Sequence, residues 1–188
     1  LSEHNNQLYF AFSVGVGTPT GGIVRLNTAG AMSLDNTFGT NGRVDLGSGR
    51  SFGDVGTGAQ VEIAFDSADN LYVTSDQFRL FAGAFPQYRP TLTKFTAAGV
   101  EDDNRILPDP GWDHSTGGLQ GDTAHSPVVD GSSVYIALDE WSWFESNKII
   151  ARNTSDLSAK WSTDIPNITY SFALFSFFTC GVYLVASK

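Results

Sequence analysis

The sequence predicts an all-β protein made of repeated four-stranded antiparallel units, and three observations lead to that prediction. The 188 residues include 20 Gly, 14 Phe, 6 Tyr and 4 Trp, a composition that suits turns and strands rather than helices. Short segments of alternating apolar and polar residues recur along the chain, as strands with one buried face require. Turn signals such as Asp-Gly and Asn-Thr-Ala-Gly separate these segments and favour tight connections between antiparallel strands.

The clearest repeat is a strand-like segment with a central tyrosine. It occurs as LYFAF, LYVTS, VYIAL and VYLVA, at residues 8–12, 71–75, 134–138 and 182–186. The tyrosines follow one another at intervals of 63, 63 and 48 residues, and they are Tyr9, Tyr72, Tyr135 and Tyr183. Self-similarity of this kind indicates a repeat architecture in which each unit is one supersecondary element.

Two further families of segments surround the tyrosine segments. An apolar run that ends in a turn signal follows them, at residues 23–30, 92–99 and 149–156. Another strand-like run with a tight turn precedes them, at residues 60–70, 125–133 and 173–181. Each unit therefore reads as four antiparallel strands, which is one blade. We expect a single repeat domain over residues 1–188, with units at about 8–46, 60–107 and 124–164 and a partial unit at 168–188.

Three segments resemble known blade repeats. RLNTAGAMSLDNTFGTNGRVDL at residues 25–46 resembles the delta-sixty repeat, and IAFDSADNLYVTS at 63–75 resembles the bacterial NHL and SBBP repeats. SPVVDGSSVYIAL followed by IIARNTSDLSAKWSTDI is similar to a quinoprotein-like blade that ends in a Trp strand. These resemblances imply a β-propeller-like array of about three to four blades, and they leave its activity open.

The ends of the chain do not complement each other in this scheme. The chain begins at the second strand of one unit and ends at the second strand of another, and Leu1 stands in place of an initiator Met. An incomplete ring would leave a sheet edge and apolar faces open. We therefore expect either a homo-oligomer that closes the ring or a larger parent chain.

The last part of the sequence allows two interpretations. Residues 165–187 include no charged residue over a length of 23, which is enough to span a bilayer. Pro166, Asn167 and several hydroxyl residues interrupt the stretch, and Gly181 falls between two strand-like runs. Two buried strands are therefore favoured over a membrane anchor.

Charge and cysteine content restrict the partners and the compartment. Eleven Lys and Arg against 20 Asp and Glu give a net charge of −9, which disfavours nucleic acid and anionic membranes as partners. The single Cys180 lies in an apolar stretch, where a small buried hydrophobe is the expected role. Few lysines and many Ser, Thr, Asn and Gly residues are typical of a secreted or cell-surface protein.

Chain direction predicts where a ligand would bind. Successive antiparallel strands reverse direction, so connections of the same parity share one end of the sheets. The connections at 27–30, 66–70, 96–99, 130–133 and 153–156 are tight, whereas those at 13–22, 47–59, 76–91, 108–124 and 139–148 are long. Because loops on rigid scaffolds carry function, we expect the long-loop face to hold the binding site.

Aromatic and acidic residues of these loops form the predicted ligand site. Aromatic rings beside carboxylates suit sugar rings, which offer an apolar face and hydroxyl groups. The predicted ligand-binding residues are Tyr88, Trp112, Asp113, His114, His125, Glu140, Trp141 and Trp143. The alternative is that these aromatics cap the core.

No motif in the sequence names a reaction, a metal or a cofactor. His114 and His125 are eleven residues apart in a Gly-rich stretch, a spacing that matches no standard zinc site. The leading hypothesis is an extracellular, non-catalytic module that binds a glycan or a protein. The alternatives are a lyase or hydrolase that uses His114 and His125, and an architectural repeat of a larger surface protein.

Overall fold

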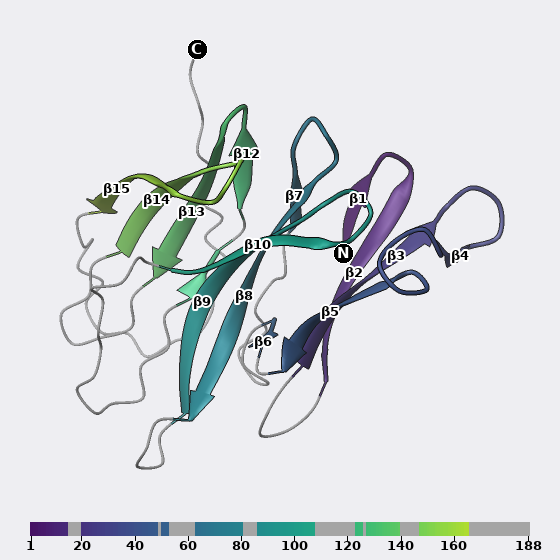
Figure 1. The fold of residues 1–188 in the computed structure, drawn as a ribbon, viewed down its shortest axis with the longest axis horizontal. Helices are drawn as coiled ribbons and strands as arrows, with labels where there is room; N and C mark the ends of the chain where they lie inside the picture. The colour runs from purple at the N-terminus through teal and green to yellow at the C-terminus, as the bar shows by residue number, and fades with distance from the viewer. Residues whose placement is uncertain are drawn as a thin grey trace, which may run out of the picture.

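The computed structural model describes residues 1–14, 20–48, 50–52, 63–80, 86–107, 123–125, 127–139 and 147–165, and it places them in 15 β-strands without any helix. The strands form three antiparallel sheets of five strands each, which lie face to face (Figure 1). The prediction of an all-β chain of antiparallel sheets is therefore confirmed for the described residues.

The three sheets follow each other in chain order. The first sheet contains β1 (Ser2–His4), β2 (Gln7–Val14), β3 (Thr20–Asn27), β4 (Ser33–Leu34) and β5 (Arg43–Ser48). The second contains β6 (Arg50–Ser51), β7 (Ile63–Phe65), β8 (Leu71–Leu80), β9 (Pro86–Phe95) and β10 (Glu101–Ile106). The third contains β11 (Thr123–Ala124), β12 (Val128–Asp130), β13 (Ser133–Asp139), β14 (Asn147–Asn153) and β15 (Ala159–Ile165).

Each sheet has strands in four positions, because one edge position is shared by two short strands. In the first sheet β4 and β5 both pair with β3, in the second β6 and β7 both pair with β8, and in the third β11 and β12 both pair with β13. The central hairpins are β2–β3, β8–β9 and β13–β14. Tyr9, Tyr72 and Tyr135 lie in β2, β8 and β13, which occupy the same position in their sheets, whereas Tyr183 lies outside the described residues.

The chain begins one strand earlier in its first sheet than the sequence predicts. Strand β1 pairs with β2 through a two-residue turn at Asn5 and Asn6, with His4 opposite Gln7. Both turn residues have positive φ, 50° and 59°, which asparagine tolerates and which two-residue hairpins require. The prediction that the chain starts at a second strand was therefore wrong, because Ser2–His4 carries no apolar residue that would mark a strand.

The predicted long loop at residues 76–91 was also wrong. Strand β8 continues to Leu80 and β9 begins at Pro86, with an unbroken ladder that pairs Phe78 with Tyr88. The connection is thus limited to residues 81–85, which lie outside the described residues. Aromatic residues favour strands, so the residues that suggested a ligand loop instead extend the hairpin.

Two hydrophobic cores lie between the three sheets, one at each interface. Tyr9, Ile23, Phe38 and Leu46 of the first sheet pack with Leu71, Val73 and Phe95 of the second. Tyr72 and Leu92 of the second sheet pack with Val134, Ile136, Leu138 and Ile150 of the third. Because neighbouring residues of a strand point to opposite faces, Leu71 and Tyr72 serve different cores. The second sheet is therefore the middle layer and is buried on both faces.

Candidate functional site

The tight turns of the three sheets meet at one end of the molecule, where they bind each other. His4 Nε2 lies 2.8 Å from Asp69 Oδ1 and joins the β1–β2 turn to the β7–β8 turn. The Tyr72 hydroxyl oxygen lies 2.9 Å from the Thr154 carbonyl oxygen, and the Thr154 amide donates to the Ser132 carbonyl at 3.1 Å. Figure 1 shows the β7–β8 and β12–β13 turns at this upper end. The polar groups of the turns therefore hold the sheets together.

Asp66 is the centre of the β7–β8 turn. Its carboxylate accepts hydrogen bonds from the Ala68 and Asn70 amides, from Asn70 Nδ2 and from the Tyr72 hydroxyl, at 2.8–3.0 Å. Burial acts to raise the pKa of Asp66, but the hydrogen bonds from Asn70, Ala68 and Tyr72 outweigh it and hold this pKa below its usual value. Burial and the neighbouring Asp66 carboxylate raise the pKa of Tyr72. Both groups are fixed in one protonation state at neutral pH and act as structural elements.

A buried ion pair of the first sheet also contacts the second sheet. Arg25 Nε lies 3.0 Å from Asp35 Oδ2, and both side chains are less than one tenth exposed. Arg25 Nη1 donates to the Ala97 carbonyl of the second sheet at 2.7 Å, and Nη2 donates to Thr37 Oγ1. Hydrogen bonds from Thr37 and the charge of Arg25 lower the pKa of Asp35. This cluster satisfies its own charges and leaves no obvious group for a ligand.

A shallow hollow of about 560 Å³ lies between the outer strands of the first and second sheets. Its lining consists of Gly39, Thr40, Arg43, Val44, Asp45, Phe95, Gly99 and Glu101. Its charged side chains form ion pairs: Arg43 Nη2 lies 2.5 Å from Asp45 Oδ1, and Arg50 Nη2 lies 2.8 Å from Glu101 Oε2. The hollow therefore presents neutralised charges on a polar surface, which is poorly suited to binding a charged ligand tightly.

Most of the predicted ligand site falls outside the described residues. Six of its eight residues are in this group: Trp112, Asp113, His114, Glu140, Trp141 and Trp143. The backbones of Tyr88 and His125 are described. Tyr88 lies in β9 and not in a loop, so its assignment as a loop residue was wrong.

His125 lies between β11 and β12 at the edge of the third sheet. Its side chain is exposed, and its amide donates to the Ala137 carbonyl at 2.9 Å. Strand β11 contacts β8 and β9, so His125 follows the point where the third sheet adjoins the strand that carries Tyr88. Within the part of the chain that the structure describes, no three His, Cys, Asp or Glu side chains are grouped so that they could hold a metal ion.

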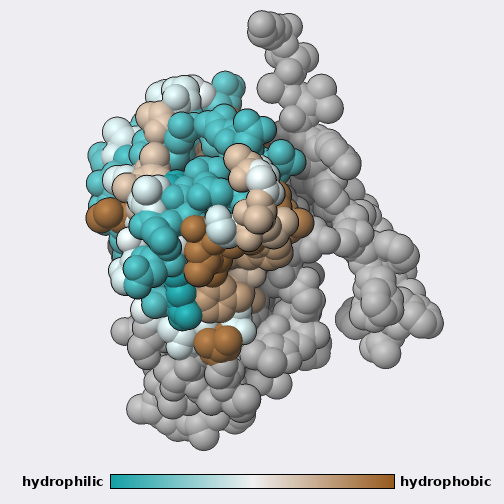
Figure 2. All heavy atoms as spheres, turned by 90° about the vertical axis from the view of Figure 1, so that its right-hand side faces the viewer, coloured by the Kyte–Doolittle hydropathy of each residue, from teal (hydrophilic) through white to brown (hydrophobic). Residues whose placement is uncertain are grey.

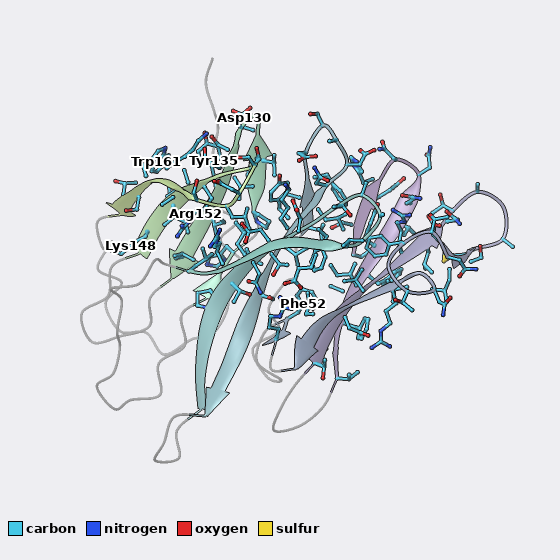
Figure 3. The ribbon with its side chains drawn as sticks, in the orientation of Figure 1. Phe52, Asp130, Tyr135, Lys148, Arg152 and Trp161 are labelled. Carbon is cyan, nitrogen blue, oxygen red and sulfur yellow. The ribbon has the colours of Figure 1, made fainter. Side chains whose placement is uncertain are left out.

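Sequence reasoning missed an aromatic pair on the third sheet. The ring centroids of Tyr135 and Trp161 are 5.9 Å apart, with an angle of 50° between the rings. Trp161 is 48% exposed, and Figure 3 shows the two rings beside each other on the outer side of the third sheet. Strand alternation contained the signal, since Tyr135 must point away from the core side chains Val134 and Ile136.

Comparisons of the chain with family models, with curated proteins and with solved structures gave no match. Within the described part of the chain, no helix is long and hydrophobic enough to cross a membrane.

Proposed function

We propose that this protein is a non-catalytic binding module of β-propeller type, which acts at the cell surface or after secretion and binds a glycan or a protein. The observation that carries this proposal is the common orientation of the three central hairpins. The last pairs before the connecting segments are Val14 with Thr20, Leu80 with Pro86 and Leu138 with Lys148. We call this end of the sheets the hairpin end. It lies away from the tight turns, as the arrowheads of β8 and β13 indicate (Figure 1).

The contrast between the two ends of the sheets supports a site at the hairpin end. At the tight-turn end, Asp66, Asp69, Tyr72 and Lys160 all form hydrogen bonds to other protein groups. At the hairpin end, residues 140–146 follow β13 and read EWSWFES. Trp141 and Trp143 offer flat apolar rings, and Glu140 offers hydrogen-bond acceptors for sugar hydroxyls.

The packing of the sheets supports the propeller arrangement. Three sheets with the same strand order stack face to face, with one core between each pair. The two end sheets keep exposed apolar side chains on their outer faces, such as Phe10 at 40% and Trp161 at 48%. A ring of blades covers such faces, because each blade is packed between two neighbours.

A glycan array tests this proposal. Replacement of Trp141 and Trp143 by Ala should lower binding about tenfold or more, since an aromatic anchor of a binding site is commonly worth 2 kcal/mol or more. The thermal midpoint should stay within about 2 °C of the wild type. Phe10→Ala is the matched control, because Phe10 is an exposed aromatic residue on the first sheet, and it should leave binding unchanged. A fall of many degrees in the midpoint with unchanged binding would show that the two tryptophans are structural.

The same array separates binding from catalysis. An enzyme would release shortened or unsaturated sugars from the ligand that it binds, and His114→Gln or His125→Gln would abolish that release. The proposal expects no product with the wild type.

A further inference from the structure

Neighbouring sheets of this protein pack by one repeated rule. The tyrosine face of the first sheet, with Tyr9, lies against Leu71 and Val73 of the second. The tyrosine face of the second sheet, with Tyr72, lies against Val134 and Ile136 of the third. At each interface, the two residues that flank the tyrosine of the later sheet pack in one core with the tyrosine of the earlier sheet.

The tyrosine face of the third sheet is the next face in this series. The ladders place Val128, Tyr135, Ala151 and Trp161 in one row across β12, β13, β14 and β15. Val128 is 47% exposed and Trp161 is 48% exposed. We call this row the third-sheet outer face. Figure 3 shows Tyr135 and Trp161 on it.

The outer face of the first sheet differs in its charge. There Arg43 lies over the Phe12 ring, with its guanidinium carbon 4.7 Å from the ring centroid, and forms an ion pair with Asp45. Figure 2 shows hydrophilic residues above and to the left of the apolar patch on this side of the molecule. The row on the third sheet consists of apolar and aromatic residues, and the polar residues Asp130 and Ser133 follow it on the same face towards the tight turn, so the row itself fits an uncharged apolar partner.

We propose that the third-sheet outer face binds residues 173–186 of this same chain. These residues lie outside the described part, and their sequence contains no charged residue but does contain a fourth tyrosine segment, VYLVA. The rule of the first two interfaces pairs Val182 and Leu184 with Tyr135, as Leu71 and Val73 pair with Tyr9. This inference does not depend on which ligand the hairpin end binds.

The chain connection makes this arrangement feasible. Strand β15, which carries Trp161, ends at Ile165, and residues 166–172 precede the apolar run that begins at Ala173. Seven extended residues span up to about 23–25 Å, whereas packed sheets are about 10 Å apart. A tethered segment also has an effective concentration in the millimolar range, which favours it over a second copy of the chain at ordinary protein concentrations.

Limited proteolysis of the full chain with chymotrypsin tests the proposal, because residues 173–186 contain many Phe, Tyr and Leu cleavage sites. Under native conditions the segment should be protected in the wild type. Trp161→Glu places a carboxylate on the third-sheet outer face and should speed cleavage within 173–186 by about tenfold or more, since a buried unpaired charge is costly. Val14→Glu is the matched control: Val14 is 55% exposed in the first sheet, and this variant should cleave like the wild type.

A second variant keeps the test valid if Trp161→Glu fails to fold by circular dichroism. Leu184→Asp should expose the segment to the same degree as Trp161→Glu. The variant that carries both substitutions should be cleaved no faster than either single variant, because both substitutions disrupt the same contact between the segment and the third-sheet outer face. Rapid cleavage of the wild-type segment overturns the proposal. Equal effects of Trp161→Glu and Val14→Glu also overturn it. Protection that disappears on dilution overturns it too, because a second copy would then cover the face.

Discussion

The two faces of the first sheet carry the same arrangement of charge and ring in opposite environments. On the inner face Arg25 lies over Phe38, 4.6 Å from the ring centroid, and pairs with Asp35. On the outer face Arg43 lies over Phe12 at 4.7 Å and pairs with Asp45. The inner pair is less than one tenth exposed, whereas the side chains of Arg43 and Asp45 are 47% and 56% exposed. The distance from cation to ring is therefore nearly constant, whereas access to water and the further hydrogen bonds of the arginine differ.

The difference shows which contacts join sheets. Arg25 also donates to the Ala97 carbonyl of the second sheet, and Lys94, which is opposite Tyr72, donates to the Ser155 carbonyl of the third. In the third sheet the residue opposite Tyr135 is Ala151. At both interfaces of the described chain, the residue opposite the tyrosine is thus a buried cation that reaches the next sheet: Arg25 at the first and Lys94 at the second. On the third-sheet outer face the small apolar residue Ala151 takes this position.

The largest expected effect follows from removing one partner of the inner pair. Asp35→Ala leaves the Arg25 guanidinium buried beside Thr37 without its carboxylate, and breaking a buried pair in this way costs about 3–5 kcal/mol. Asp45→Ala removes the matching carboxylate of the outer pair and should cost less than about 1 kcal/mol. Urea unfolding at pH 7 measures both values. Similar losses for the two variants would mean that burial is not the decisive difference.

An effect of intermediate size concerns Asp66 and acid. Asp66→Asn weakens the hydrogen bonds that the carboxylate accepts from Asn70 and Tyr72, which should cost about 1.5–3 kcal/mol at pH 7. The pKa of Asp66 lies below its usual value of 3.8. The unfolded chain therefore binds a proton at Asp66 more readily than the folded chain does. The stabilisation that the Asp66 carboxylate provides is present above about pH 4 and is lost as pH falls through the folded-state pKa of Asp66.

The pH profile of unfolding free energy checks this sign. Wild type and Asp66→Asn should differ at pH 7 and converge as the pH approaches 2. Asp69→Asn is a useful control, because Asp69 lies in the same turn but its carboxylate is half exposed. A difference between wild type and Asp66→Asn that persists unchanged at pH 2 would show that the side-chain charge is not responsible.

Sequence patterns predicted the strands better than the contacts between them. Alternation around Tyr9, Tyr72 and Tyr135 was sufficient to place three equivalent strands, since each segment has β-branched or aromatic residues on a buried face. Strand β1 escaped prediction because Ser2–His4 has no apolar residue. The hairpin of β8 and β9 was predicted as a long loop at residues 76–91, although Phe78 and Tyr88 form a regular cross-strand pair.

Long-range polar contacts could not be predicted for a different reason. Arg25 meets Ala97 over 72 positions and His4 meets Asp69 over 65 positions, and no local pattern records such a pairing. The Tyr135–Trp161 pair was accessible in principle, because strand alternation places Tyr135 outside the core, but the register that brings Trp161 opposite Ala151 requires the fold. The predicted ligand residues Trp112, Asp113, His114, Glu140, Trp141 and Trp143 lie outside the described residues, so their role stays a prediction that the structure does not test.

The smallest expected effect returns to the outer pair and separates its two contributions. Arg43→Ala removes an exposed ion pair with Asp45 and a cation above the Phe12 ring, each worth about 0.5–1 kcal/mol or less at an exposed site. Arg43→Lys keeps the charge but loses the planar group that stacks on the ring. If the ion pair dominates, the loss caused by Arg43→Ala should shrink when the salt concentration rises from 0.1 to 1 M, because screening weakens exposed pairs. If the ring contact dominates, the loss should persist in high salt and Arg43→Lys should reproduce part of it. A loss above 2 kcal/mol in either case would mean that another chain or segment buries this face, and it would remove the contrast between the two faces of the first sheet.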